Sequence, residues 1–156
     1  MKLRTSFPVG SVLVRGTLAV LALLIIYFRF GPPNEVEADM VNEVIYGLVL
    51  PAWLILQTIF IVLLVGTPIR AIEGVYNWWV KRPWIPLLML AAGIALCILS
   101  TQDNFAEQVP VAKDSEEKFT VAFYPFLYAG WFLSAFALLH CYPESFYRPA
   151  KKSDWD

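Results

Sequence analysis

The chain has 156 residues, of which 58% are hydrophobic and only 16% charged, and its formal net charge is −1. A water-soluble domain of this length has too little interior to bury so much apolar surface. Composition therefore excludes an ordinary soluble fold and indicates an integral membrane protein. Two cysteines and one histidine also argue against a disulfide framework or a metal centre, and we expect no metal and no cofactor.

Four apolar runs have the length of membrane spans, which need roughly 20 helical residues to cross a core of about 30 Å. The spans are predicted at about residues 11–30, 44–66, 84–100 and 115–142. They predict an all-α fold, an up-and-down bundle of four transmembrane helices that forms a single membrane domain over residues 1–156.

Prolines are expected to bend two of these spans. Pro51 lies inside the second span, and Pro125 inside the fourth. A proline within a helix removes one hydrogen bond and its ring clashes with the preceding turn, so each predicts a kink. Ser115 is expected to cap the fourth span, with Glu116 and Glu117 in its first turn.

An amphipathic segment at about residues 68–82 connects the second and third spans. Thr67 followed by Pro68 is typical of a helix start. Apolar residues then recur at helical spacing, namely Ile69, Ile72, Tyr76, Trp79 and Val80. We predict an interfacial helix in the cytoplasmic headgroup layer, which either anchors the chain or docks a partner. The polar stretch at 101–118 is expected to be a solvated tether or a recognition loop.

Charges beside the spans predict the orientation, because basic residues accumulate on the cytoplasmic side. One side of the membrane would carry nine of the 12 basic residues, namely Lys2, Arg4, Arg15, Arg70, Lys81, Arg82, Arg148, Lys151 and Lys152. The other side would carry nine of the 13 acidic residues, namely Glu35, Glu37, Asp39, Glu43, Asp103, Glu107, Asp114, Glu116 and Glu117. Both termini are therefore predicted to be cytoplasmic.

Polar residues inside the spans are the first candidates for a role beyond packing. Arg15 is expected to extend to the headgroup layer, or else to serve as a functional buried charge. Gln57 is expected to hydrogen-bond another helix, or to contact a substrate or quinone. Ser134 lies in the fourth span near Gly130, and these small residues predict a close approach of helices.

Aromatic residues are the candidate partner surface. In the fourth span they occur on nearly all sides of the helix, so a bundle of four helices cannot bury every one. Their neighbours are lipid or another subunit. The candidate partner-binding residues, from the fourth span and the interfacial segment, are Tyr128, Trp131, Phe132, Trp78, Trp79 and Tyr76.

The sequence contains no recognisable pattern of catalytic residues, and we do not expect an enzyme. Cys97 and Cys141 are predicted at opposite membrane faces, too far apart for thiol exchange. His140 lacks the second axial ligand that a haem site needs. No acidic residue falls inside a span, where coupled transport generally requires one, and no nucleic-acid-binding pattern is present.

The expected function is that of a non-catalytic membrane interaction protein, an accessory or assembly subunit of a larger membrane complex. Its partners would be membrane lipid and a membrane protein or further copies of itself, in a bacterial inner (plasma) membrane. Two alternatives remain open. One is an immunity or inhibitor protein against a membrane-acting toxin, and the other is a small transporter or a quinone-binding subunit.

Overall fold

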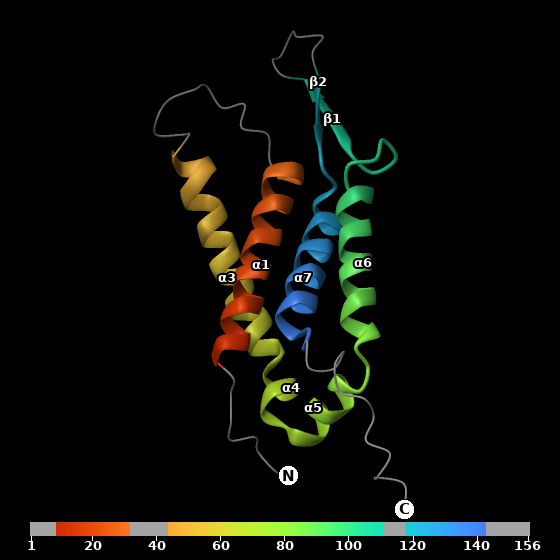
Figure 1. The fold of residues 1–156 in the computed structure, drawn as a ribbon. Helices are drawn as coiled ribbons and strands as arrows, with labels where there is room; N and C mark the ends of the chain where they lie inside the picture. The colour runs from red at the N-terminus through yellow and green to blue at the C-terminus, as the bar shows by residue number, and fades with distance from the viewer. Residues whose placement is uncertain (1–8, 32–43, 111–117, 143–156) are drawn as a thin grey trace, which may run out of the picture.

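The computed structural model describes residues 9–31, 44–110 and 118–142, and most of them are helical. Figure 1 shows four helical rods side by side, with two short helices at one end and a small hairpin at the other. The rods are α1 (Val9–Phe30), η1 (Ile45–Val49) continuing into α3 (Leu50–Val65), α6 (Trp84–Leu99) and α7 (Tyr124–His140). The ends of the molecule are called here the hairpin end and the α4–α5 end.

Two of these helical stretches, Val12–Phe30 and Ile45–Val65, are long and apolar enough to cross a membrane. A third qualifies if α5 and α6 are counted as one span with a bend of 72°. Helix α6 has 16 residues and α7 has 17. The helices identify the chain as an integral membrane protein, with two or three candidate spans by length and composition.

The disturbance expected at Pro51 takes the form of a wide turn rather than a sharp bend. The N–H of Leu50 donates to the Ile45 carbonyl, which closes a π-helical turn. Pro51 comes directly after this turn, where its missing N–H is tolerated near the start of α3. The stretch Ile45–Val65 therefore continues as one rod.

The segment between α3 and α6 forms two short helices, not the single interfacial helix predicted over 68–82. They are α4 (Thr67–Ala71) and α5 (Glu73–Val80). The break falls at Ile72, whose backbone is extended. Residues on both sides of it, Ile69 and Trp79, form one buried cluster with Tyr142. The bend brings Ile69 and Trp79 to the same site, whereas a straight helix would separate them by about 15 Å along its axis.

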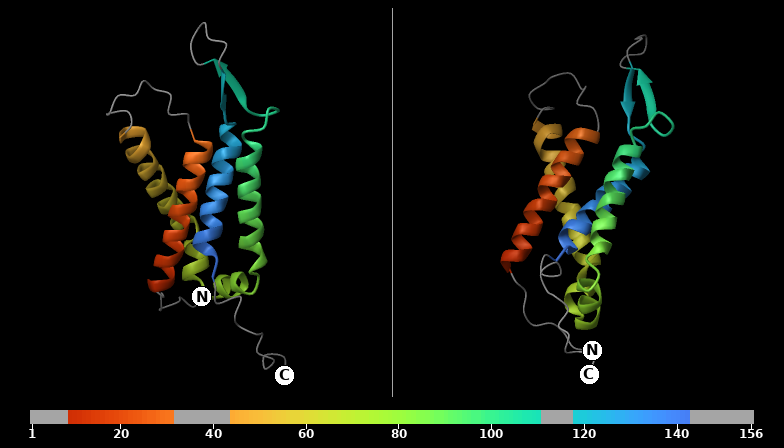
Figure 2. Two further views of the ribbon diagram at one scale, coloured as in Figure 1. Left: turned by 45° about the horizontal axis from the view of Figure 1, so that its top comes forward. Right: turned by 45° about the vertical axis from the view of Figure 1, so that its right-hand side comes forward.

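The fourth span begins later than predicted. Residues 118–121 belong to strand β2 (Lys118–Val121), which pairs antiparallel with β1 (Glu107–Pro110), and the helix starts only at Tyr124. Pro125 consequently lies in the first turn of α7 and does not kink it. The expected cap Ser115 and the two glutamates after it lie outside the described residues. Figure 2 shows the hairpin projecting beyond the ends of α6 and α7.

The core runs between α1, α3, α6 and α7. Ala19 and Leu23 of α1 and Ala135 of α7 have no exposed surface at all. Large apolar side chains such as Ile25, Phe60 and Leu88 instead point outward. A rod bundle with an apolar exterior is stable only where lipid or protein surrounds it.

Candidate functional site

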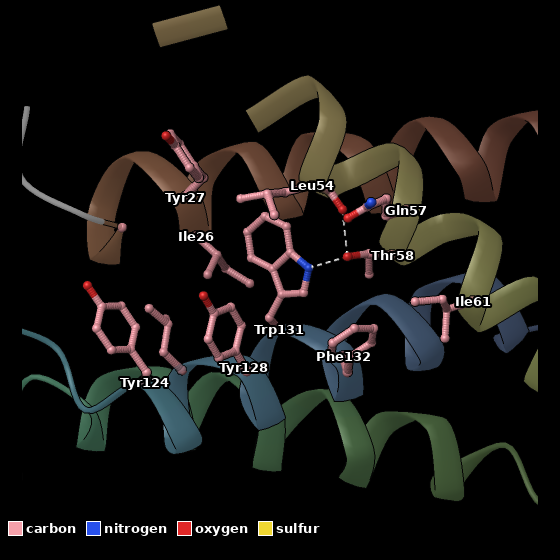
Figure 3. Close-up of a pocket in the computed structure, with 12 residues that line it drawn as sticks. Ile26, Tyr27, Leu54, Gln57, Thr58, Ile61, Tyr124, Tyr128, Trp131 and Phe132 are labelled. Atoms are coloured by element: carbon pink, nitrogen blue, oxygen red, sulfur yellow. Dashed lines mark hydrogen bonds between the residues drawn. The ribbon is translucent and has the colours of Figure 1, made fainter. Parts of the chain in front are cut away.

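A groove lies between α3 and α7, with α1 as its floor. Its volume is about 130 Å³. Each wall is one helical stripe, with residues three or four apart. The α3 wall consists of Leu54, Gln57, Thr58 and Ile61, the α7 wall of Tyr124, Leu127, Tyr128, Trp131 and Phe132, and the floor of Ile26, Tyr27 and Gly31. Figure 3 shows these side chains around the hollow.

A hydrogen bond joins the two walls of this α3–α7 groove. The indole Nε1–H of Trp131 donates to the Thr58 hydroxyl oxygen at 2.7 Å (Figure 3). That hydroxyl in turn donates to the Leu54 carbonyl at 2.8 Å. Both Thr58 and Trp131 are buried, so the bond is protected from competing partners and holds the two helices in register at this depth.

The polar groups that line the groove differ in whether they have a hydrogen-bond partner. The Tyr27 hydroxyl donates to the Tyr46 carbonyl at 2.9 Å. Tyr124 and Tyr128 stack on each other, with ring centroids 5.9 Å apart. Gln57 is exposed, and its amide makes no hydrogen bond to any residue in the described ranges. In hydrocarbon an amide without a partner costs roughly 2–7 kcal/mol.

Opposite the groove, α7 meets α6 along a seam of small residues, as the sequence predicted. Gly93 and Gly130 face each other, and Ser134 lies against Gly93. A Cβ added to Gly130 would come within 2.5 Å of the Gly93 carbonyl oxygen and 2.7 Å of the Cys97 sulfur. The seam thus has no room for another ligand, and the Ser134 hydroxyl is buried there.

Arg15 is only 5% exposed, because it packs against the end of α7, and its extension to the headgroup layer stays a prediction. Its guanidinium donates to the Leu139 carbonyl at 3.3 Å and lies 4.4 Å from the ring centre of Tyr142. Burial lowers the pKa of the nearby Arg70 guanidinium, and the charge of Arg15 acts in the same direction. A hydrogen bond between Arg70 and Tyr142 acts in the opposite direction on this pKa. Arg15 thus joins α1 to the end of α7, and Arg70 joins α4 to Tyr142 just beyond it.

The α4–α5 end is held to α7 by aromatic residues. Trp79 is buried, and its indole N–H donates to the His140 carbonyl at 2.7 Å. Tyr76 packs edge-on against Tyr142, with ring centroids 5.1 Å apart. The His140 ring is fully buried, with Nδ1 3.0 Å from the Phe136 carbonyl and Gly66 packed directly against Nε2. The cluster fastens α7 to α5 and leaves no opening for a substrate.

The candidate partner residues thus fall into two groups. Tyr128, Phe132 and Trp78 are exposed, and the first two lie on the groove. Trp131 and Trp79 are buried and hydrogen-bonded within the chain. What the sequence analysis missed is the α3 wall as a unit. Its 54-57-58-61 spacing was visible, but nothing in the sequence paired it with a stripe of α7 some 70 residues later.

Reactive groups do not gather elsewhere in the part of the chain that the structure describes. No set of three or more His, Cys, Asp or Glu side chains there could hold a metal ion. Cys97 lies at the level of Gly130, and Cys141 follows 11 residues later, about 16 Å along the helix axis. A disulfide requires Cα atoms within about 7 Å, so the two thiols do not join within one chain. Comparison with protein-family models, curated proteins and solved structures finds no match.

Proposed function

We propose that this chain is a non-catalytic subunit of a membrane-protein assembly, and that its α3–α7 groove receives a transmembrane helix. All four rods would cross the membrane, α6 and α7 as its shorter spans. The outward faces of these two helices support that topology, because they carry large apolar side chains such as Leu88, Ile94 and Tyr128. The membrane would be a bacterial inner membrane, with both termini in the cytoplasm.

The exposed amide of Gln57 is the observation that carries this proposal. It lies in the middle of α3, among Trp53, Leu56 and Phe60, which are also exposed. Lipid tails offer no hydrogen-bond partner, whereas a neighbouring helix does, and polar side chains commonly join transmembrane helices for this reason. An unpaired glutamine at mid-span therefore favours a protein neighbour over lipid.

The shape of the groove supports a helix as the occupant. Both walls are stripes with the 3–4 spacing by which helices pack against one another, and the bond from Trp131 to Thr58 joins them. Towards the hairpin end α3 leans away from α7 (Figure 1). A third helix fits between such walls by placing its side chains into the hollow, in the helix-in-groove mode.

Photo-cross-linking tests this proposal without knowing the partner. Benzoylphenylalanine in place of exposed Tyr128, irradiated in native membranes, should join the chain to a protein. The matched control is the same group in place of Leu88, which is exposed on α6 away from the groove. Adducts to lipid alone at position 128, or equal protein adducts at both positions, would contradict the proposal.

The size of the hollow favours one second candidate, a ring-bearing lipid such as an isoprenoid quinone. A dry apolar cavity of about 150 Å³ accepts a benzene ring, and this groove has a volume of about 130 Å³. The Gln57 amide could donate to a ring carbonyl. Organic extracts of the purified protein should then show quinone absorbance near one equivalent per chain, and an extract without it would dismiss this candidate.

A further inference from the structure

We infer that the helix in the groove is α3 of a second copy of this chain, so that the assembly contains a two-fold dimer. This inference rests on the proposed function and names the partner of the same site. The two-fold axis would run along the membrane normal, close to the two Gln57 side chains.

Helix α3 presents a second stripe to the outside, next to the one that lines the groove. Its members are exposed by 57% at Trp53, 61% at Leu56, 67% at Phe60 and 63% at Leu64, and all are large and apolar. Gln57 lies between the two stripes. Helix α3 therefore forms one wall of its own groove and also exposes a surface that can enter the groove of a second copy.

The amide chemistry of Gln57 selects an identical partner. A glutamine side chain has donor and acceptor groups together, so two of them can exchange two hydrogen bonds across a two-fold axis. Copies that insert with the same orientation hold Gln57 at the same depth. The match is therefore automatic for a second copy, while any other protein would need a polar residue at that level.

The size of the hollow fits the same arrangement. Rotation about the membrane normal keeps every residue at its own depth, so Trp53 of the second copy lies level with Leu54, which lines the groove. Trp53 is exposed in the single chain, and the hollow is of ring size. In the dimer each copy would insert its Trp53 into the groove of the other, and both of these rings would be buried.

Disulfide trapping in native membranes tests the position of the axis. Gln57→Cys should give an oxidant-dependent band at twice the 17.7 kDa of one chain, because the bond forms only where Cα atoms come within about 7 Å. The parent chain measures the background from Cys97 and Cys141, and Leu88→Cys is the matched control on α6. A band for Leu88→Cys as strong as that for Gln57→Cys would overturn the inference.

Energy transfer between labelled copies in lipid vesicles tests the amide itself. Gln57→Leu keeps the apolar length of the span and should weaken association roughly 3- to 30-fold. Gln57→Asn retains the amide and should lose less. Thr17→Val, which removes an exposed hydroxyl from α1 that bonds its own helix at Leu13, should change nothing. Equal association of all four chains would overturn the inference.

The mass of the photo-adduct at position 128 distinguishes the dimer from the broader proposal that the groove receives a helix of any protein. A product of twice the chain mass supports the dimer. A product with a different protein refutes the dimer and leaves the proposed function standing. If only lipid is cross-linked, the groove does not receive a helix and both fail.

Discussion

Single residues in the α6–α7 seam decide how closely these helices approach. Membrane helices gain little from the hydrophobic effect against each other, because lipid tails are equally apolar. Their association depends instead on van der Waals packing between closely spaced backbones. Gly93 and Gly130 provide this close spacing, because a Cβ added at either position would come within 3 Å of the other glycine's carbonyl oxygen. Gly16 of α1 is different, since a Cβ there would meet nothing within 4 Å.

Gly130→Ala should therefore destabilise the protein by about 1–3 kcal/mol, because the new methyl group forces α6 and α7 apart. Gly16→Ala is the matched control. It should be neutral or stabilising by up to about 1 kcal/mol, as alanine favours the helix. The measurement is thermal unfolding in one detergent for both variants. Equal midpoints would show that the seam is looser than the contacts at Gly130 imply.

At the scale of elements, a hydrogen bond from Trp79 joins α5 to α7. Trp79 donates to the His140 carbonyl at the end of α7, where a helix leaves its last carbonyls without partners inside the helix. The neighbouring Trp78 is exposed, and the Arg82 guanidinium lies over its ring, 4.4 Å from the ring centre. Adjacent tryptophans thus have different roles, in agreement with the helical spacing, which places Trp79 but not Trp78 in the apolar stripe.

Trp79→Phe should lower the free energy of unfolding by about 1–3 kcal/mol, because it leaves a buried carbonyl unsatisfied. Trp78→Phe makes the same chemical change at an exposed site and should have an effect below about 0.5 kcal/mol. Denaturant titration of both variants in micelles provides the comparison. A larger loss for Trp78→Phe would indicate that Trp78 is covered by a partner.

The sequence predicted α1, the Ile45–Val65 stretch and α6 to within about two residues, because glycine, proline or charge bounds each apolar run. It failed over residues 118–121. Glu116 and Glu117 resemble the first turn of a helix, and the run after Lys118 is apolar. What decides the structure there is pairing with β1, a contact between segments that no local pattern encodes. The start at Tyr124 follows from that pairing.

The groove was less predictable than the helices. Gln57 was recognised as the exceptional polar residue of its span, and Tyr128 and Phe132 as candidate contacts. Periodicity identifies the face of a helix but not the helix that it meets. The bond from Trp131 to Thr58 therefore became visible only in three dimensions. The same bond removes Trp131 from the free surface.

At the scale of the whole molecule, charge is distributed by end. Basic residues Arg15, Arg70, Lys81 and Arg82 lie towards the α4–α5 end (Figure 1). The hairpin end carries acidic Asp103 and Glu107. Basic loops are retained in the cytoplasm during insertion, so we expect the α4–α5 end to be cytoplasmic.

Reporter fusions after Arg82 and at Asp156 should therefore be active as cytoplasmic proteins, and a fusion near Gln108 as an exported one. Alkaline phosphatase and a fluorescent protein give complementary readouts at each site. A cytoplasmic signal at Gln108 would reverse the orientation and would turn the α4–α5 end outward.

The unequal lengths of the rods connect the groove to the thickness of the bilayer. Helix α1 has 22 residues and the Ile45–Val65 stretch has 21, against 16 in α6 and 17 in α7. At 1.5 Å per residue, the longer pair measures about 31–33 Å and the shorter pair about 24–26 Å. Long helices adapt to a thin membrane by tilting, and α3 leans away from α7 towards the hairpin end (Figure 1).

Hydrophobic mismatch thus acts on the angle that opens the α3–α7 groove. On the proposed four-span topology, a thinner bilayer would suit α6 and α7 and increase the tilt of α3, which would widen the hollow. A thicker bilayer would draw α3 upright towards Tyr128 and Phe132 and narrow the hollow. We therefore expect occupancy of the groove to rise as lipid acyl chains shorten.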